Sequence, residues 1–271
     1  MAAGDTSTLP RREFLGRASA LAGLVVSFAP GMRLIDLAAA KPDGEAASAE
    51  VRWGMLVDAT RCVSGCDACV KACATEHGLE MTDRPEIDAQ WIRKVDLIDE
   101  NSGREISLPV MCQHCEDAPC IKACPCGALH KAEGGTVAID YNVCCGHGTC
   151  VEVCPYGALY LDPVAKQAVK CHNCYHRTEE GMEPACVPTC PSEALYFGDL
   201  NDPESKIVGA MREAEEADGE LQQLRPEKET RPRMWFAGPA PAVVEEAVPG
   251  EGESYNPEAY NIYNWKKSNQ E

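Results

Sequence analysis

Aromatic side chains are scarce in this chain. Phe, Trp and Tyr make up 6% of its 271 residues, which is little for a chain that has to build a large apolar core. Soluble domains usually run to roughly 100–200 residues, so the length predicts one or two core units. Another source of folding free energy is therefore expected. Bound metal supplies one, because its binding free energy becomes folding free energy.

Basic residues are also few. The chain has 25 Lys and Arg against 43 Asp and Glu, a formal net charge of −18. Nucleic acids and anionic lipid surfaces attract basic proteins, so this balance argues against nucleic-acid binding and against direct lipid binding. An acidic surface fits a protein that meets protein partners, and it fits simple solubility equally well.

Motifs of substrate chemistry are missing as well. The sequence contains no Walker loop, no G-x-G-x-x-G and no evident pairing of a nucleophile with a base. We therefore predict no catalytic residue and expect that any catalysis belongs to a partner.

Cysteine, in contrast, is abundant. Of 17 Cys, all but Cys126 fall into four groups that each end C-x3-C, and groups two to four continue with Pro. This is close to the C-x2-C-x2-C-x3-C-P run of bacterial ferredoxins, whose fourth Cys ligates a neighbouring cluster. The groups are Cys62, Cys66, Cys69 and Cys73; Cys112, Cys115, Cys120 and Cys124; Cys144, Cys145, Cys150 and Cys154; and Cys171, Cys174, Cys186 and Cys190.

Two other uses of cysteine compete with this interpretation. A secreted disulfide framework does not call for C-x2-C pairs closed by C-x3-C. Zinc sites use C-x2-C pairs but need neither the third Cys of each group nor the C-x3-C-P ending. The pattern therefore favours iron–sulfur clusters.

The sequence also repeats itself around the cysteines. C-P-C-G-A-L, C-P-Y-G-A-L and C-P-S-E-A-L begin at Cys124, Cys154 and Cys190. Cys126 aligns with Tyr and Ser in the other copies, so we expect it to be a buried or half-buried free thiol. A strand is expected at residues 136–140, after the turn Gly134-Gly135, and the unit is strand, cluster loop, short helix, strand.

The N-terminus predicts export. Arg11-Arg12 precedes an apolar run, residues 18–28, about half of the roughly 20 residues that cross a bilayer, and Ala38-Ala39-Ala40 follows. This resembles a twin-arginine signal, a route for proteins that are already folded. An ordinary secretory signal and a chance amphipathic helix are the alternatives. Residues 1–50 are accordingly assigned to a signal peptide and linker.

The C-terminal part, residues 203–271, differs in character. Asp202-Pro203 is a good helix start, and we expect a helix to about Leu224 followed by an extended tail. Aromatic residues in that acidic tail either anchor a partner or fold back on their own domain. They are Tyr255, Tyr260, Tyr263 and Trp265.

The four groups, with M-C-Q-H-C-E-D-A-P-C-I-K-A-C-P from Met111, resemble the four-cluster iron–sulfur subunits of the dimethyl sulfoxide, tetrathionate and polysulfide reductase superfamily. W-G-M-L-V-D from Trp53 and F-G-D-L-N-D-P from Phe197 resemble a narrower branch: exported subunits of sulfur-metabolism membrane complexes, including the one linked to dissimilatory sulfite reduction. The resemblance implies an α+β fold with two ferredoxin-like double-cluster units within residues 51–202. It also implies a periplasmic electron relay in a respiratory complex, not catalytic alone.

The resemblance further implies partners and ligands. The partners are a quinone-interacting polytopic membrane subunit and a multihaem cytochrome c or a molybdopterin catalytic subunit. A soluble periplasmic molybdopterin reductase and a free periplasmic ferredoxin are alternative contexts. Cluster one takes Cys62, Cys66, Cys69 and Cys190; cluster two takes Cys112, Cys115, Cys120 and Cys154; cluster three takes Cys124, Cys144 and Cys150; cluster four takes Cys171, Cys174, Cys186 and Cys73.

Cluster three departs from the family pattern, because position 147 holds His147 where the spacing requires Cys. Its fourth ligand is His147, Cys145 or none, and the last case gives a [3Fe-4S] cluster beside three [4Fe-4S] clusters. Each alternative implies a different potential for this cluster.

Other residues receive simpler expectations. His114 and His172 either donate to cluster sulfur or are half-exposed rim residues. His77, His130 and His176 are expected at the surface. Trp53 is expected in the core, at the start of a strand.

The first prediction concerns export. Replacing both Arg11 and Arg12 with Lys should abolish periplasmic accumulation of cluster-loaded protein, because a folded protein cannot thread through a secretory pore. Cell fractionation measures this, and normal periplasmic yield from the double variant would contradict the twin-arginine assignment.

Overall fold

The computed structural model describes residues 51–79, 90–98, 105–162 and 164–238. The chain divides into two compact units, residues 1–41 and 42–271, and everything described belongs to the second. The expected signal with Arg11 and Arg12 and the aromatic tail from Tyr255 to Trp265 lie outside the described residues.

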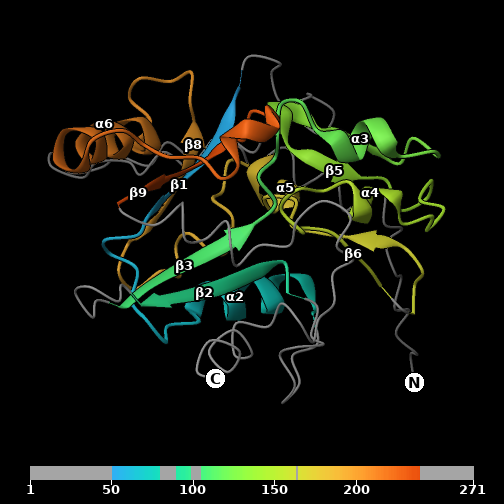
Figure 1. The fold of residues 1–271 in the computed structure, drawn as a ribbon, viewed down its shortest axis with the longest axis horizontal. Coiled ribbons are helices and arrows are strands. Elements are labelled where there is room, and N and C mark those ends of the chain that lie inside the picture. The colour runs from blue at the N-terminus through green and yellow to red at the C-terminus, as the bar shows by residue number, and fades with distance from the viewer. Residues whose placement is uncertain (1–50, 80–89, 99–104, 163, 239–271) are drawn as a thin grey trace, which may run out of the picture. The chain divides into compact units, whose positions relative to one another are not determined.

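A three-stranded sheet joins segments that are far apart in sequence. β1 (Trp53–Asp58) is its central strand; it pairs antiparallel with β8 (Leu195–Asp199) and parallel with β9 (Met234–Ala237). Trp53 starts β1 as expected and stacks on Phe197, with ring centroids 5.1 Å apart. Residues before the first cysteine group and after the last one are thereby held side by side (Figure 1).

Helix α6 (Lys206–Asp218) covers this sheet through Ile207, which packs with Leu56 and Ala237. The helix is shorter at both ends than the sequence predicts. Asp202 forms a turn instead of a cap: its carbonyl accepts from the amide of Ser205, and its carboxylate accepts from that of Glu204. At the other end, Gly219 ends the helix, and Gln222 bridges to Phe236 of β9.

The other strands form two-stranded ladders. β2 (Ile92–Ile98) pairs with β3 (Glu105–Met111), β4 (Leu129–Lys131) with β5 (Val137–Ile139), and β6 (Tyr160–Leu161) with β7 (Ala168–Val169), all antiparallel. The strand expected at residues 136–140 is β5. The mixed α+β class is therefore confirmed.

A short helix accompanies each cysteine group. These are α2 (Ala68–His77), α3 (Pro119–Ala123), α4 (Thr149–Glu152) and α5 (Tyr175–Thr178). Two 3-10 turns complete the described elements, η2 (Glu133–Gly135) and η3 (Pro226–Lys228). Because α3 to α5 have only four or five residues, loops and side chains do most of the positioning here.

The core is built largely from aliphatic side chains and sulfur. Its few large aromatic members include Tyr156 and Phe236, which are 1% and 0% exposed. Tyr156 hydrogen-bonds through its hydroxyl to Thr230, near the C-terminal end of the described chain. Cysteine thiols fill much of the remaining interior, as the small aromatic content predicts.

Candidate metal centres

The structure collects the cysteine thiols into four sets, and each set combines thiols from two different groups. Cys69 lies with Cys62, Cys66 and Cys190, for example, although Cys190 ends the fourth group. The other sets are Cys73 with Cys171, Cys174 and Cys186; Cys112 with Cys115, Cys120 and Cys154; and Cys150 with Cys124 and Cys144.

Burial and mutual repulsion oppose ionisation of these thiols. Burial raises the pKa of Cys69 to about 11 despite the charge of Lys94, and it raises the pKa of Cys115 and of Cys171 to about 12. Iron binds thiolates, so loading these sets must release protons. Buried groups of three or four soft sulfur ligands are the donor set that iron–sulfur clusters require.

Backbone amides favour the thiolate at two repeat positions. For Cys190, burial raises the pKa, but the amides of Ala194, Ser192 and Leu195 and the Ser192 hydroxyl outweigh burial and lower it. Cys124 starts another copy of the repeat. There too burial raises the pKa, and following amides, among them that of Leu129, lower it more. The turn after each C-P thus positions N–H groups around a sulfur.

His114, between Cys112 and Cys115, is buried and incompletely paired. Its Nδ1 accepts from the amide of Val137 at 3.1 Å, and burial holds its pKa well below the usual range. The neutral ring therefore carries its proton on Nε2, which has no partner among the described residues. A bound cluster would satisfy this donor through a sulfur atom. The alternative of a half-exposed rim residue is wrong, because His114 is 4% exposed.

Lys94 introduces a positive charge that the sequence did not reveal. It lies on β2, is 8% exposed, and donates from Nζ to Sγ of Cys62 at 2.8 Å. Nothing in the local sequence marks this lysine, because only the strand's position in the fold brings it to the thiol set.

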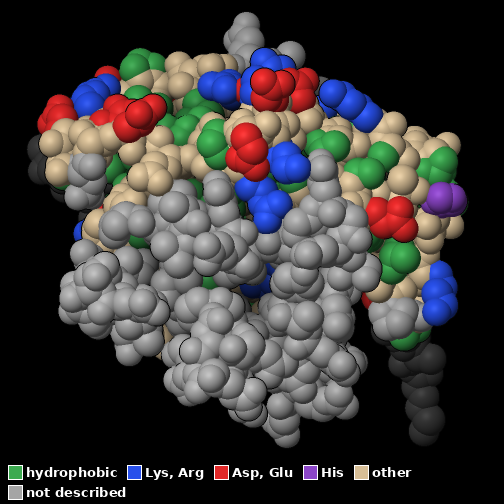
Figure 2. Space-filling model, viewed as in Figure 1, with side chains coloured by type: hydrophobic (Ala, Val, Ile, Leu, Met, Phe, Trp, Pro, Cys, Tyr) green, Lys and Arg blue, Asp and Glu red, His purple; other side chains and the backbone are tan. Residues whose placement is uncertain are grey.

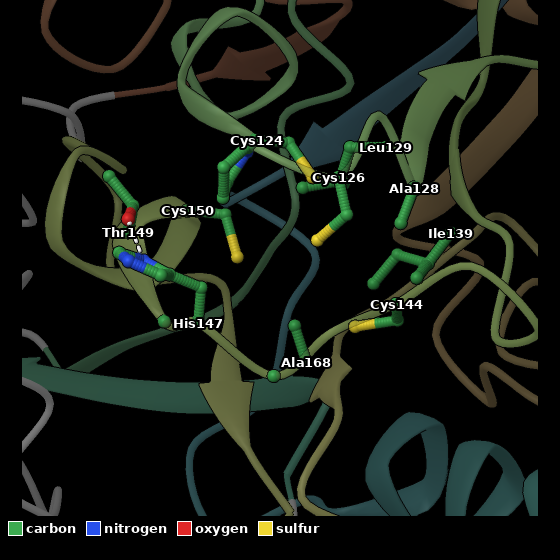
Figure 3. A pocket seen from close by; sticks show the side chains of 13 residues that line it. Cys124, Cys126, Ala128, Leu129, Ile139, Cys144, His147, Thr149, Cys150 and Ala168 are labelled. Atoms are coloured by element: carbon green, nitrogen blue, oxygen red, sulfur yellow. Dashed lines mark hydrogen bonds between the residues drawn. The ribbon is translucent and has the colours of Figure 1, made fainter.

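The set of Cys124, Cys144 and Cys150 lines a pocket together with His147. Figure 3 shows the sulfurs of Cys144 and Cys150 inside this pocket, whereas the His147 ring lies at its edge beside Thr149. His147 is exposed, and its Nδ1 pairs with the Thr149 hydroxyl. The structure thus brings three of the expected ligands together and directs the histidine elsewhere.

Cys126 is not a free thiol, contrary to expectation. It forms a disulfide with Cys145, with Cα atoms 6.3 Å apart. Alignment of the repeats could not reveal this pairing, because Cys145 belongs to a different group and is adjacent to Cys144. In this state Cys145 has no thiolate to offer a cluster.

His77 was expected at the surface, but it is half-buried against a thiol set. Its Nε2 lies 3.1 Å from Sγ of Cys174, and its ring lies on Trp91 with centroids 4.5 Å apart. Burial lowers its pKa to about 4, with a smaller contribution from His176. The sequence contained a signal for this position, because Cys73 and His77 are four residues apart on α2 and so share one face. His130 and His176 are exposed, as expected.

Comparison with known proteins agrees with this geometry. Residues 105–200 match the model of the 4Fe-4S dicluster domain. The chain is 32% identical to the B subunit of tetrathionate reductase from Salmonella typhimurium over 216 residues, 77% of this chain and 82% of that protein. It belongs to the 4Fe-4S iron–sulfur subunits of the dimethyl sulfoxide, tetrathionate and polysulfide reductase family. This iron–sulfur subunit is also 32% identical to the B subunit of selenate reductase from Mesobacillus selenatarsenatis over 220 residues, 69% of the chain and 72% of that protein. With the corresponding polypeptide of polysulfide reductase from Wolinella succinogenes it shares 38% identity over 160 residues, 58% and 81% of the two proteins.

Family membership confirms two expectations from the sequence. The protein carries 4Fe-4S clusters held by cysteines, and it is an electron-transfer subunit rather than a catalyst on its own. The buried thiol sets and the unpartnered Nε2 of His114 fit such clusters.

The second prediction concerns the set with three thiols. With Cys145 in a disulfide and His147 beside Thr149, we expect a three-iron cluster, which gives an electron paramagnetic resonance signal in the oxidised protein. Four-iron clusters are silent in that state. His147→Cys should supply the fourth thiolate and remove the signal, whereas His147→Ala should keep it.

Cys145→Ser is the matched control for this experiment. It breaks the disulfide and should leave the signal and the iron content unchanged. A silent oxidised wild type that loses one cluster in Cys145→Ser would instead make Cys145 the ligand.

Proposed function

We propose that this protein is a periplasmic subunit that relays single electrons through four iron–sulfur clusters in a membrane-associated respiratory complex of sulfur metabolism. The single observation that carries the proposal is the convergence of thiols from distant groups into four sets. Each bound cluster supplies a one-electron redox centre, and the chain supplies the ligands, the burial and the surrounding charge.

The proposed ligands follow the thiol sets. Cluster one is held by Cys62, Cys66, Cys69 and Cys190; cluster two by Cys112, Cys115, Cys120 and Cys154; cluster three by Cys124, Cys144 and Cys150; cluster four by Cys73, Cys171, Cys174 and Cys186. Two ferredoxin-like units then follow, with clusters one and four in one unit and clusters two and three in the other.

Contacts between the sets suggest an order for the relay. Cys69 of set one acts on Cys186 of set four, and Cys112 of set two acts on Cys171 of set four. Set four therefore lies between sets one and two. Because α3 and α4 pack together, Cys120 of set two and Cys150 of set three are carried on neighbouring helices. We propose the linear order one, four, two, three.

The proposed partners follow from the relatives, each of which is one component of a reductase. They are a quinone-interacting membrane subunit and a multihaem cytochrome c or a molybdopterin subunit. No helix of the described residues is long and apolar enough to span a bilayer. On the face in Figure 2, acidic and basic side chains lie next to each other, which suits protein contacts. The link to dissimilatory sulfite reduction rests on the segments at Trp53 and Phe197.

The third prediction tests this context. Deleting residues 255–271 should weaken co-purification with a membrane subunit from solubilised membranes and leave cluster content intact, because β9 ends at Ala237. Wild type that purifies alone would favour a free ferredoxin, and wild type with only a molybdopterin subunit would favour a soluble reductase. Loss of iron from the truncated protein would show that the tail is structural.

The fourth prediction concerns Lys94. Lys94→Met should lower the reduction potential of cluster one by about 60 mV or more, because removing a cation beside a ligand sulfur disfavours the added electron. Lys94→Arg keeps the charge and should retain most of the potential. Lys206→Met on α6 serves as the control and should change nothing. A redox titration followed by electron paramagnetic resonance measures each case, and an unchanged potential in Lys94→Met would contradict the assignment.

A further inference from the structure

Three histidines outside the thiol ligands converge at the surface next to set four. They come from three segments: His77 ends α2, His172 lies in the loop between Cys171 and Cys174, and His176 lies on α5. One ring nitrogen from each lies within 4.8 Å of the other two. His77 and His172 are half-buried and His176 is exposed, so solvent ions can reach the point between them.

The rings face one another edge to face instead of stacking in parallel. Ring planes of His77 and His172 meet at 79°, those of His77 and His176 at 85°, and those of His172 and His176 at 72°. Trp91 lies against both His77 and His172, with centroids 4.5 and 5.1 Å away, and supports them from one side. The trio is thus held together by neighbours from a fourth segment.

Hydrogen bonds around the trio match those of metal-binding histidines, which usually donate their other N–H to an acceptor. Nε2 of His176 pairs with the Glu76 carboxylate at 2.8 Å, and Nε2 of His77 pairs with Sγ of Cys174 at 3.1 Å. Each leaves a lone pair on the opposite nitrogen. His172 accepts the amide of Tyr175 on Nδ1 at 3.3 Å, a long bond that a metal on that lone pair would replace.

The local charge also suits a cation. Glu76 lies beside His176, although Arg177 shares its carboxylate through a 2.9 Å contact. The thiolates of set four lie on the other side of His77 and carry negative charge when iron is bound. A divalent ion at the trio would therefore be attracted from two directions.

We propose that His77, His172 and His176 bind one divalent transition-metal ion of the zinc type. Three imidazoles with an open fourth position are a donor set that zinc accepts, and cobalt, nickel and copper share the preference for imidazole. The consequence rests on the proposed function of set four: positive charge beside that cluster raises its reduction potential. Occupancy of the histidine site then adjusts one step of the relay.

The test uses the full cluster-loaded protein, titrated anaerobically with Co²⁺ and, separately, with Zn²⁺. We expect one ion bound per chain in addition to the cluster iron, with Co²⁺ giving visible ligand-field bands. His176→Ala removes an exposed ligand and should weaken binding at least about tenfold. His130→Ala removes an exposed histidine elsewhere and should leave the affinity unchanged.

Two readouts separate this site from the relay itself. Iron and sulfide content report the clusters and should be equal in wild type and His176→Ala. Zn²⁺ should raise the potential of one cluster in wild type and of none in the variant. Absence of saturable uptake, or equal affinity in His176→Ala, would overturn the site. Binding that leaves every potential unchanged would overturn the coupling to set four.

Discussion

The whole arrangement depends on bringing four sulfur atoms to one point from segments that are distant in sequence. Cys62 and Cys190 belong to one set, and Cys73 joins Cys171, so the first and last cysteine groups are bound to each other twice. The central sheet follows the same logic, because β1 needs β8 and β9 beside it. Ion pairs extend this closure: Glu116 contacts Arg52 near the start of the described chain and Arg231 and Arg233 near its end. Metal, sheet and charge all join the same two ends.

The chain keeps that architecture with few aromatic residues because clusters occupy interior volume and supply binding energy. The associated cost is electrostatic, since groups of buried thiolates repel one another. The structure offsets this repulsion locally: backbone amides surround Cys124 and Cys190, Lys94 reaches Cys62, and His114 is positioned as a neutral donor. These devices differ between the sets, so the reduction potentials should differ as well.

Sequence reasoning identified the features that are encoded by local spacing. C-x3-C-P runs and their repeat indicated the metal, the short helices and β5, because ligand geometry imposes fixed intervals on a loop. Features that depend on three-dimensional proximity were missed. Lys94 becomes a partner of Cys62 only through the placement of β2, and Cys126 meets Cys145 only when two repeats lie together. The helix at Asp202 shows a third limit: its capping signals were real, but the side chain closed a turn and the helix began at Lys206.

The central position of β1 has a consequence for the order of events during synthesis. Cys62 leaves the ribosome 128 residues before Cys190, its partner in set one. At about 5–20 residues per second, that interval lasts roughly 6–26 s, during which the earliest thiols have no complete coordination shell. β1 waits longer still, because β9 emerges last among the described strands. The nascent chain therefore cannot mature domain by domain from its N-terminus. Its first cysteine group has to be protected from oxidation and from stray metals until translation is almost complete, which makes cluster delivery a post-translational step for this subunit.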